Sequence, residues 1–199
     1  MEQAVNRHPF PIGALVILAC LAGCGATRMK TTWKAPDTSR IHFRKIVAFV
    51  LAKDETVRRN GELELCERIK TVPCAPAFSV VPDADRGNVD AVAKRVDAAG
   101  FDGAVVLRYS GQRVQQTYVQ TAPLWGYYGY GWGTAYNPGY VRQDQLVDVE
   151  TTVYSVRDQK LLWAGVTETM NPSDVRRTVR EIVDATAKAM RKEGLIPAE

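Results

Sequence analysis

Residues 44–52 read RKIVAFVLA, and the six apolar residues at their centre, 46–51, decide the fold class of this chain. The run has the length of a strand, is rich in β-branched residues and is apolar on both alternating faces. That pattern is typical of a strand inside a sheet covered on both sides. Such strands run parallel to their neighbours and need helical crossovers, so the stretch predicts an α/β arrangement.

Two helix–strand units are expected to follow this strand. A helix is predicted at residues 54–70, with a weak middle at Asn60-Gly61, and its inward residues are expected to be Val57, Leu63, Cys66 and Ile69. A short strand at 77–81, a helix at 89–99 and a strand at 101–109 complete a β-α-β-α-β series. Right-handed crossovers would make the three strands parallel.

The second half of the chain predicts a hairpin and a final helix. Residues 146–156 alternate between apolar and polar side chains, which indicates a half-exposed strand, and 161–169 would return beside it. Asn171 is expected to cap the last helix, with Pro172 at its first position. The buried stripe of this helix is expected to consist of Val175, Val179, Ile182, Val183, Thr186 and Met190. The fold class is therefore α/β (α+β), a single domain with a mixed sheet of about five strands and three helices.

The amino terminus predicts export and lipidation. Residues 12–22 are mostly apolar but too short for the roughly 20 residues that cross a bilayer. Leu21-Ala22-Gly23-Cys24 resembles the lipobox of bacterial lipoproteins, with Cys20 a poorer candidate. The resemblance implies a signal peptide at residues 1–23 and an acylated Cys24. Ordinary signal-peptide cleavage, with Cys24 incidental, is the alternative.

The predicted anchor also bounds location and partners. Residues 24–30 would form a tether, and residues 31–199 the folded domain, held close to a membrane. Gly25 is not the Asp that favours inner-membrane retention in lipoproteins, so the resemblance implies the periplasmic face of the outer membrane. The net charge of +4 is far from that of a nucleic-acid-binding protein. We therefore expect no nucleic acid as a partner.

Cys66 and Cys74 remain once Cys20 is removed and Cys24 is acylated. The periplasm permits disulfides, and a bond between these two would join a helix end to the next strand. A buried free thiol at Cys66 is the alternative. Their spacing excludes a CxxC redox site.

One segment stands out by composition. Residues 114–141 carry no charge, and 123–140 combine closely spaced glycines with seven aromatic residues: Trp125, Tyr127, Tyr128, Tyr130, Trp132, Tyr136 and Tyr140. Glycine at this density predicts a long loop. The loop could bind a protein, enter the membrane boundary, stack on sugar rings or fold onto its own domain.

Catalytic motifs are missing from the sequence. His42 is the only histidine after the signal, without a GxSxG or HExxH motif beside it. Asp148 and Glu150 share one face of a predicted strand, with Glu168 on the next strand, and paired acids can serve acid–base chemistry. A solvated sheet face is the commoner reason for such a pair. No metal and no cofactor are expected.

Several stretches together resemble a group of uncharacterised Gram-negative outer-membrane lipoproteins. They are the lipobox, Thr31-Thr32-Trp33, residues 45–50, Glu55 with Arg58-Arg59, residues 101–106, residues 149–154 and residues 161–165. The start of the domain is also similar in outline to the N-terminal domain of TolB and to the curli secretion lipoprotein. This resemblance implies a role in envelope assembly.

The sequence therefore predicts a non-enzymatic, lipid-anchored envelope protein. It would dock a protein partner, or further copies of itself, through the aromatic loop. The alternative is a ligand-binding protein or hydrolase with a site beneath that loop at Asp148 and Glu150.

Overall fold

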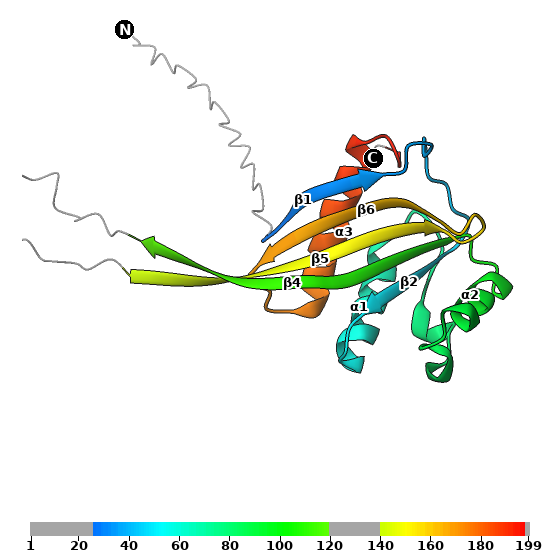
Figure 1. Cartoon of the computed structure of the whole chain (residues 1–199), viewed down its shortest axis with the longest axis horizontal. Helices are drawn as coiled ribbons and strands as arrows, with labels where there is room; N and C mark the ends of the chain where they lie inside the picture. The colour runs from blue at the N-terminus through cyan, green and yellow to red at the C-terminus, as the bar shows by residue number, and fades with distance from the viewer. Residues whose placement is uncertain (1–25, 120–139, 198–199) are drawn as a thin grey trace, which may run out of the picture.

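The computed structural model describes residues 26–119 and 140–197. Six strands form one mixed sheet in the order β1-β6-β5-β4-β2-β3 (Figure 1). The strands are Thr27–Lys34 (β1), Ile46–Leu51 (β2), Cys74–Pro76 (β3), Gly103–Val119 (β4), Tyr140–Ser155 (β5) and Lys160–Met170 (β6). The helices are Glu55–Arg68 (α1), Val89–Ala98 (α2) and Val175–Lys192 (α3), with short 3-10 turns at Ala77–Ser79 and Asp83–Asp85.

β2 is the centre of the parallel part, as its apolar sequence predicts. It runs parallel to both β3 and β4, with Ile46 opposite Cys74 on one side and Gly103 on the other. The remaining pairs, β4–β5, β5–β6 and β6–β1, are antiparallel. The predicted α/β class, mixed sheet and C-terminal helix are confirmed.

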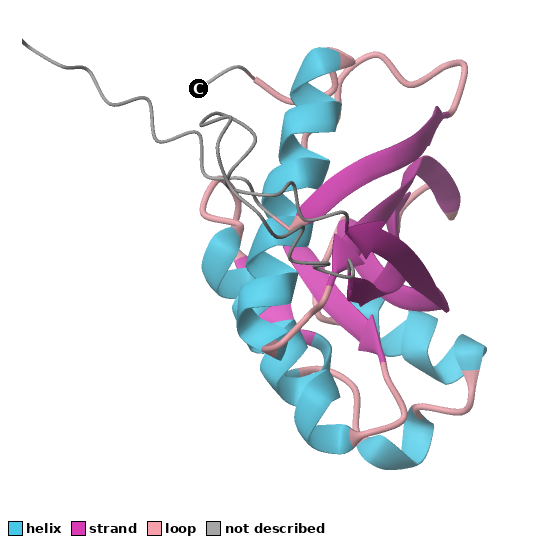
Figure 2. Ribbon diagram, turned by 90° about the vertical axis from the view of Figure 1, so that its left-hand side faces the viewer, coloured by secondary structure: helices cyan, strands magenta, loops and turns pink. Residues whose placement is uncertain are grey.

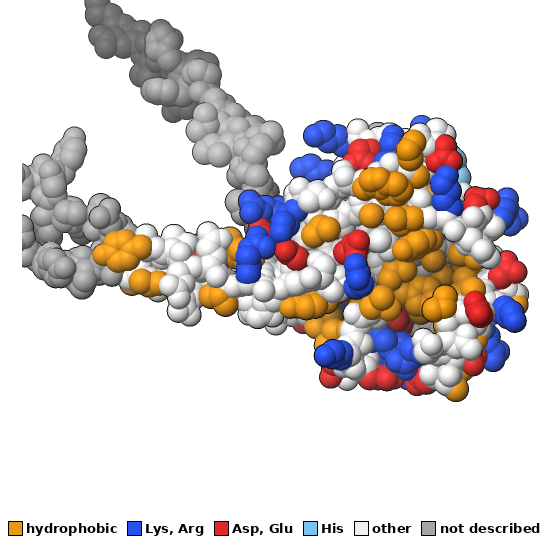
Figure 3. Space-filling view, viewed as in Figure 1, with side chains coloured by type: hydrophobic (Ala, Val, Ile, Leu, Met, Phe, Trp, Pro, Cys, Tyr) orange, Lys and Arg blue, Asp and Glu red, His pale blue; other side chains and the backbone are white. Residues whose placement is uncertain are grey.

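Side chains of β2 alternate between two hydrophobic cores. Ile46 and Ala48 pack in the larger core with α1 and α3, whereas Val47 packs in a smaller core with Val96 of α2. Figure 2 shows helices on both sides of the sheet. On the α2 side, no helix in the described part of the chain covers β1, β6 and β5, and their side chains reach the surface in Figure 3.

The sequence did not predict β1. Seven of its eight residues pair with β6, with a bulge at Lys30, so residues 27–30, expected in the tether, lie in the sheet. Polar and charged residues dominate this edge strand and no alternation marks it. As a result, only Gly25 and Ala26 separate Cys24 from the first strand.

The strand expected at residues 77–81 was wrong. Pairing with β2 ends at Pro76, and Ala77–Ser79 forms a 3-10 turn. The backbone amide of Phe78 donates a 2.9 Å hydrogen bond to Glu62 Oε2 of α1. The carboxylate thus accepts the bond that a neighbouring strand would have accepted.

The buried face of α1 also differs from the prediction. Leu63 is exposed, and Arg58, Glu62, Glu64 and Leu65 are buried instead. Burial raises the pKa of Glu62, although the amide of Phe78 and the guanidinium of Arg58 oppose that effect. Glu64 accepts a hydrogen bond from Arg180 of α3 at 3.2 Å.

α3 begins at a different residue from the one expected. Asp174 caps it by accepting a 2.8 Å hydrogen bond from the amide of Arg177. Asn171 lies before the helix and binds β5 instead. The expected apolar stripe is buried at Val179, Ile182, Thr186 and Met190, and Gly194, with φ of +72°, follows the helix end.

Candidate functional site

A two-stranded arm, formed by the end of β4 and the start of β5, projects from the sheet next to the uncharged aromatic segment. β6 pairs with β5 only as far as Leu146, opposite Met170. Beyond that point, among the residues that the structure describes, 140–145 of β5 pair only with 114–119 of β4, from Val114–Gln145 to Val119–Tyr140. Figure 1 shows this arm leaving the body of the domain.

The arm exposes apolar side chains. Val114, Tyr118, Tyr140 and Val141 are each between 55% and 61% exposed. An isolated two-stranded hairpin has little stability in water, and exposed aromatic surface is typical of binding sites. The arm therefore combines exposed apolar side chains with a pair of strands that has little stability of its own.

The aromatic segment of the sequence, residues 123–140, ends where β5 begins. Tyr140 is the first residue of β5. The other residues of the predicted binding loop, Trp125, Tyr127, Tyr128, Tyr130, Trp132 and Tyr136, lie outside the described residues, as does Cys24.

Asn171 joins the root of the arm to the start of α3. Its side-chain Oδ1 accepts a 2.7 Å hydrogen bond from the backbone amide of Gln145. Its backbone amide donates a 2.7 Å hydrogen bond to the backbone carbonyl of Gln145. Its Nδ2 donates to Asp144 Oδ1 at 2.8 Å. That bond lowers the pKa of Asp144, and Arg142, 2.8 Å from the other carboxylate oxygen, lowers it further.

A charged network crosses the sheet next to this root. Glu168 of β6 is 3% exposed and binds Arg28 of β1 at 2.7 Å and Arg113 of β4. Asp148 of β5 binds Lys30 at 2.8 Å and Arg113 at 3.1 Å. These ion pairs connect β1, β6, β5 and β4 where the arm leaves the sheet.

The candidate acids are all ion-paired. Asp148 lies opposite Glu168 in the β5–β6 register, which the sequence could not establish. Glu150 pairs with Arg108, whose Nε is 2.9 Å from Glu150 Oε2. Each carboxylate thus has a cationic partner, and the described residues contain no group of three or more potential metal ligands.

Sequence reasoning missed the basic half of this network and the clamp at Asn171. Arg113 is the last charge before the uncharged segment, and Arg142 and Asp144 are the first after it. Their positions on the two sides of that segment could have predicted that they lie close together, because the two strands that flank a hairpin tip are paired.

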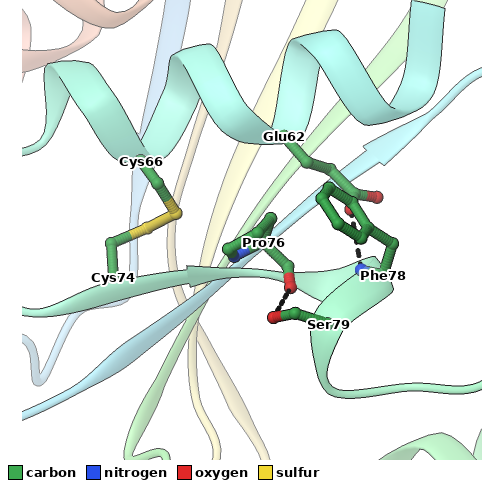
Figure 4. The surroundings of a disulfide bond; sticks show 6 residues. All are labelled: Glu62, Cys66, Cys74, Pro76, Phe78 and Ser79. Carbon is green, nitrogen blue, oxygen red and sulfur yellow. Dashed lines mark hydrogen bonds between the residues drawn. A yellow bond between two sulfur atoms is a disulfide. The ribbon is translucent and has the colours of Figure 1, made fainter. Parts of the chain in front are cut away.

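A disulfide joins Cys66 of α1 to Cys74 of β3, with the Cα atoms 5.2 Å apart. Figure 4 shows it beside the contact between Glu62 and Phe78. Both links hold the segment after α1 against the helix. They lie at the far edge of the sheet from β1.

No protein-family model matches the chain, and no curated protein matches it. Solved structures resemble its fold at low identity. A PelC dodecamer from Paraburkholderia phytofirmans is 9% identical over 81% of this chain and 96% of that one, with a TM-score of 0.42. A second PelC dodecamer crystal form from that organism is 8% identical over 85% and 96%, with a TM-score of 0.41.

Lipoprotein GNA1162 from Neisseria meningitidis is 14% identical over 74% of this chain and 98% of that one, with a TM-score of 0.36. Likenesses at this level carry no inference about function, ligand or assembly. They do not show the expected likeness to TolB or to the curli secretion lipoprotein, which stays a prediction.

Proposed function

We propose that this chain is a lipid-anchored protein of the cell envelope that docks a protein partner through the β4–β5 arm and the aromatic segment at its tip. The arm carries this proposal. Its two strands have no third neighbour within residues 26–119 and 140–197 and expose valine and tyrosine side chains, so docking would stabilise it.

The position of β1 supports a partner close to the membrane. Thr27, the first residue of β1, lies opposite Thr169, and Thr169 lies opposite Val147 at the root of the arm. β1 therefore starts at the end of the sheet from which the arm projects, and the predicted anchor, Cys24, is three residues before that start in the sequence. In the described part of the chain no helix is both long and apolar enough to cross a membrane.

The ion pairs support a non-enzymatic role over the alternative hydrolase. A general acid or base must exchange a proton with a substrate. Asp148 and Glu150 instead bind Lys30, Arg113 and Arg108 within the sheet, which suits a rigid base for the arm.

Photocrosslinking in intact cells tests the proposal. A photoreactive residue at Tyr118, on the arm, is expected to give a protein adduct of higher mass. The matched control is Tyr154, an aromatic residue 36% exposed on the sheet outside the arm, which should give none. An adduct of twice the monomer mass would identify a second copy as the partner. Equal labelling at both positions, or none at Tyr118, would contradict the docking role.

A further inference from the structure

A cavity of about 770 Å³ lies at the other end of the sheet from the arm. Residues 37–44, which lead from β1 to β2, form one wall, and the turn from β5 to β6 forms the other. Its basic lining residues are Arg40, His42, Arg44, Arg157 and Lys160. This volume is in the range of small-molecule sites.

Two arginines in this cavity differ from the other arginines that the structure describes. Within residues 26–119 and 140–197, Arg40 and Arg157 form no ion pair or hydrogen bond. Every other arginine in those ranges has a partner. Both of these arginines are lining residues of the same cavity.

The carboxylates of the cavity already have donors of their own. Asp37 pairs with Lys160. Asp102 accepts hydrogen bonds of 2.9–3.0 Å from the amides of Arg44 and Lys45, and Asp158 accepts one of 2.7 Å from Ser155. The hydrogen bond from Lys160 lowers the pKa of Asp37, so this pair stays ionised. The cavity is left with an excess of cationic donors.

We propose that this cavity is a binding site for an anionic ligand whose phosphate or carboxylate groups are held by Arg40 and Arg157. A guanidinium group donates two parallel hydrogen bonds to such an anion and keeps its charge at all physiological pH values. Ile41 and Leu162 supply apolar surface in the same cavity, which would contact the uncharged part of the ligand.

The sheet geometry favours a soluble or polymeric anion over a lipid headgroup. β1 runs from Thr27 at the arm end to Lys34 at the cavity end. Eight residues of strand span roughly 26 Å, so the cavity is at the far end of the sheet from the predicted anchor.

Calorimetric titration of the full-length protein in a neutral detergent tests the site. The probes are inorganic pyrophosphate and the short-chain lipid dihexanoylphosphatidylglycerol, at constant ionic strength. Arg40→Gln and Arg157→Gln should each weaken pyrophosphate binding about tenfold or more, because each removes charged hydrogen bonds. The matched control, Lys188→Gln, removes one charge from the exposed face of α3 and should leave the affinity unchanged.

The variants also separate the outcomes. Unchanged unfolding temperatures would show that lost binding reflects the site and not the fold. Tighter binding of the lipid than of pyrophosphate, lost in both arginine variants, would support the anion site and identify a headgroup as its source. No saturable binding of either probe, or equal weakening by Lys188→Gln, would overturn the proposal. None of these results depends on the arm.

Discussion

The indole ring of Trp163 lies against the backbone of Gly165, two residues further along β6. A Cβ atom at Gly165 would be 2.3 Å from Trp163 Cη2, and Trp163 is fully buried. Its Nε1 donates a 2.9 Å hydrogen bond to Glu193 at the end of α3. The ring therefore holds α3 on the sheet, and Gly165 provides the room for it.

Gly165→Ala is expected to destabilise the fold by about 1–3 kcal/mol, because the buried ring must move to admit a methyl group. Urea unfolding followed by tryptophan fluorescence would measure the change. Gly111→Ala is the control, since a Cβ there meets no atom within 4 Å. Equal effects of the two substitutions would show that the ring is not the cause.

The clamp at Asn171 should control the order of the arm. Asn171→Gly keeps a residue that accepts the φ of 49° but removes the side-chain bonds to Gln145 and Asp144. Hydrogen exchange at the amides of residues 140–145 should become faster, whereas exchange in β2 should not change. Unchanged exchange in the arm would show that the clamp is not needed.

Acid should loosen the same region. The pKa of Asp144 is lower in the folded protein than its ordinary value of 3.8. The ionised carboxylate therefore favours the folded arm root at pH values above about 3.8, and this contribution disappears as the pH falls through the lowered value. Exchange rates corrected for intrinsic pH effects should rise there, and Asp144→Asn should remove the dependence.

Loss of either of two ion-paired acids on the sheet, Glu168 or Glu150, should affect stability to a different extent. Glu168→Gln removes a buried carboxylate whose cations are partly exposed, so we expect a loss of about 1–3 kcal/mol, less than for a fully buried pair. Glu150→Gln removes a more exposed pair and should cost at most about 1 kcal/mol. The free energy of unfolding in urea compares them, and the reverse order would contradict the role given to Glu168.

Replacement of both Cys66 and Cys74 by serine should destabilise the oxidised protein by about 2–3 kcal/mol, the value expected for closing a short loop. Thiol-reactive mass tagging without reductant should leave both cysteines of the natural chain unmodified. Full modification would show that they are reduced in the cell. The substitution should then have little effect on stability.

Cys24→Ser should abolish incorporation of radiolabelled fatty acid, because the lipobox assigns acylation to that thiol. Cys20→Ser is the matched control and should leave labelling intact. Labelling that survives in Cys24→Ser and disappears in Cys20→Ser would move the anchor to the second candidate.

Periodicity predicted the elements whose burial follows a simple pattern. The continuous apolar run of β2, the alternation in β5 and the stripe of α3 each depend on contacts that repeat with the period of the element. The predicted buried face of α1 was wrong because two of its acids are buried against partners far along the chain: Glu62 accepts from the amide of Phe78, and Glu64 accepts from Arg180. Such pairing has no periodic signature.

By itself the sequence determined the class of fold, the parallel pairing of β2 with β4 and the uncharged aromatic segment, since these follow from local hydrophobicity and glycine content. Only the tertiary structure decided that β1 joins the sheet, that residues 114–119 and 140–145 form an arm clamped by Asn171, and that Arg40 and Arg157 line one cavity. Each of those features depends on strand register or on contacts between distant residues, which the pattern along one chain does not contain.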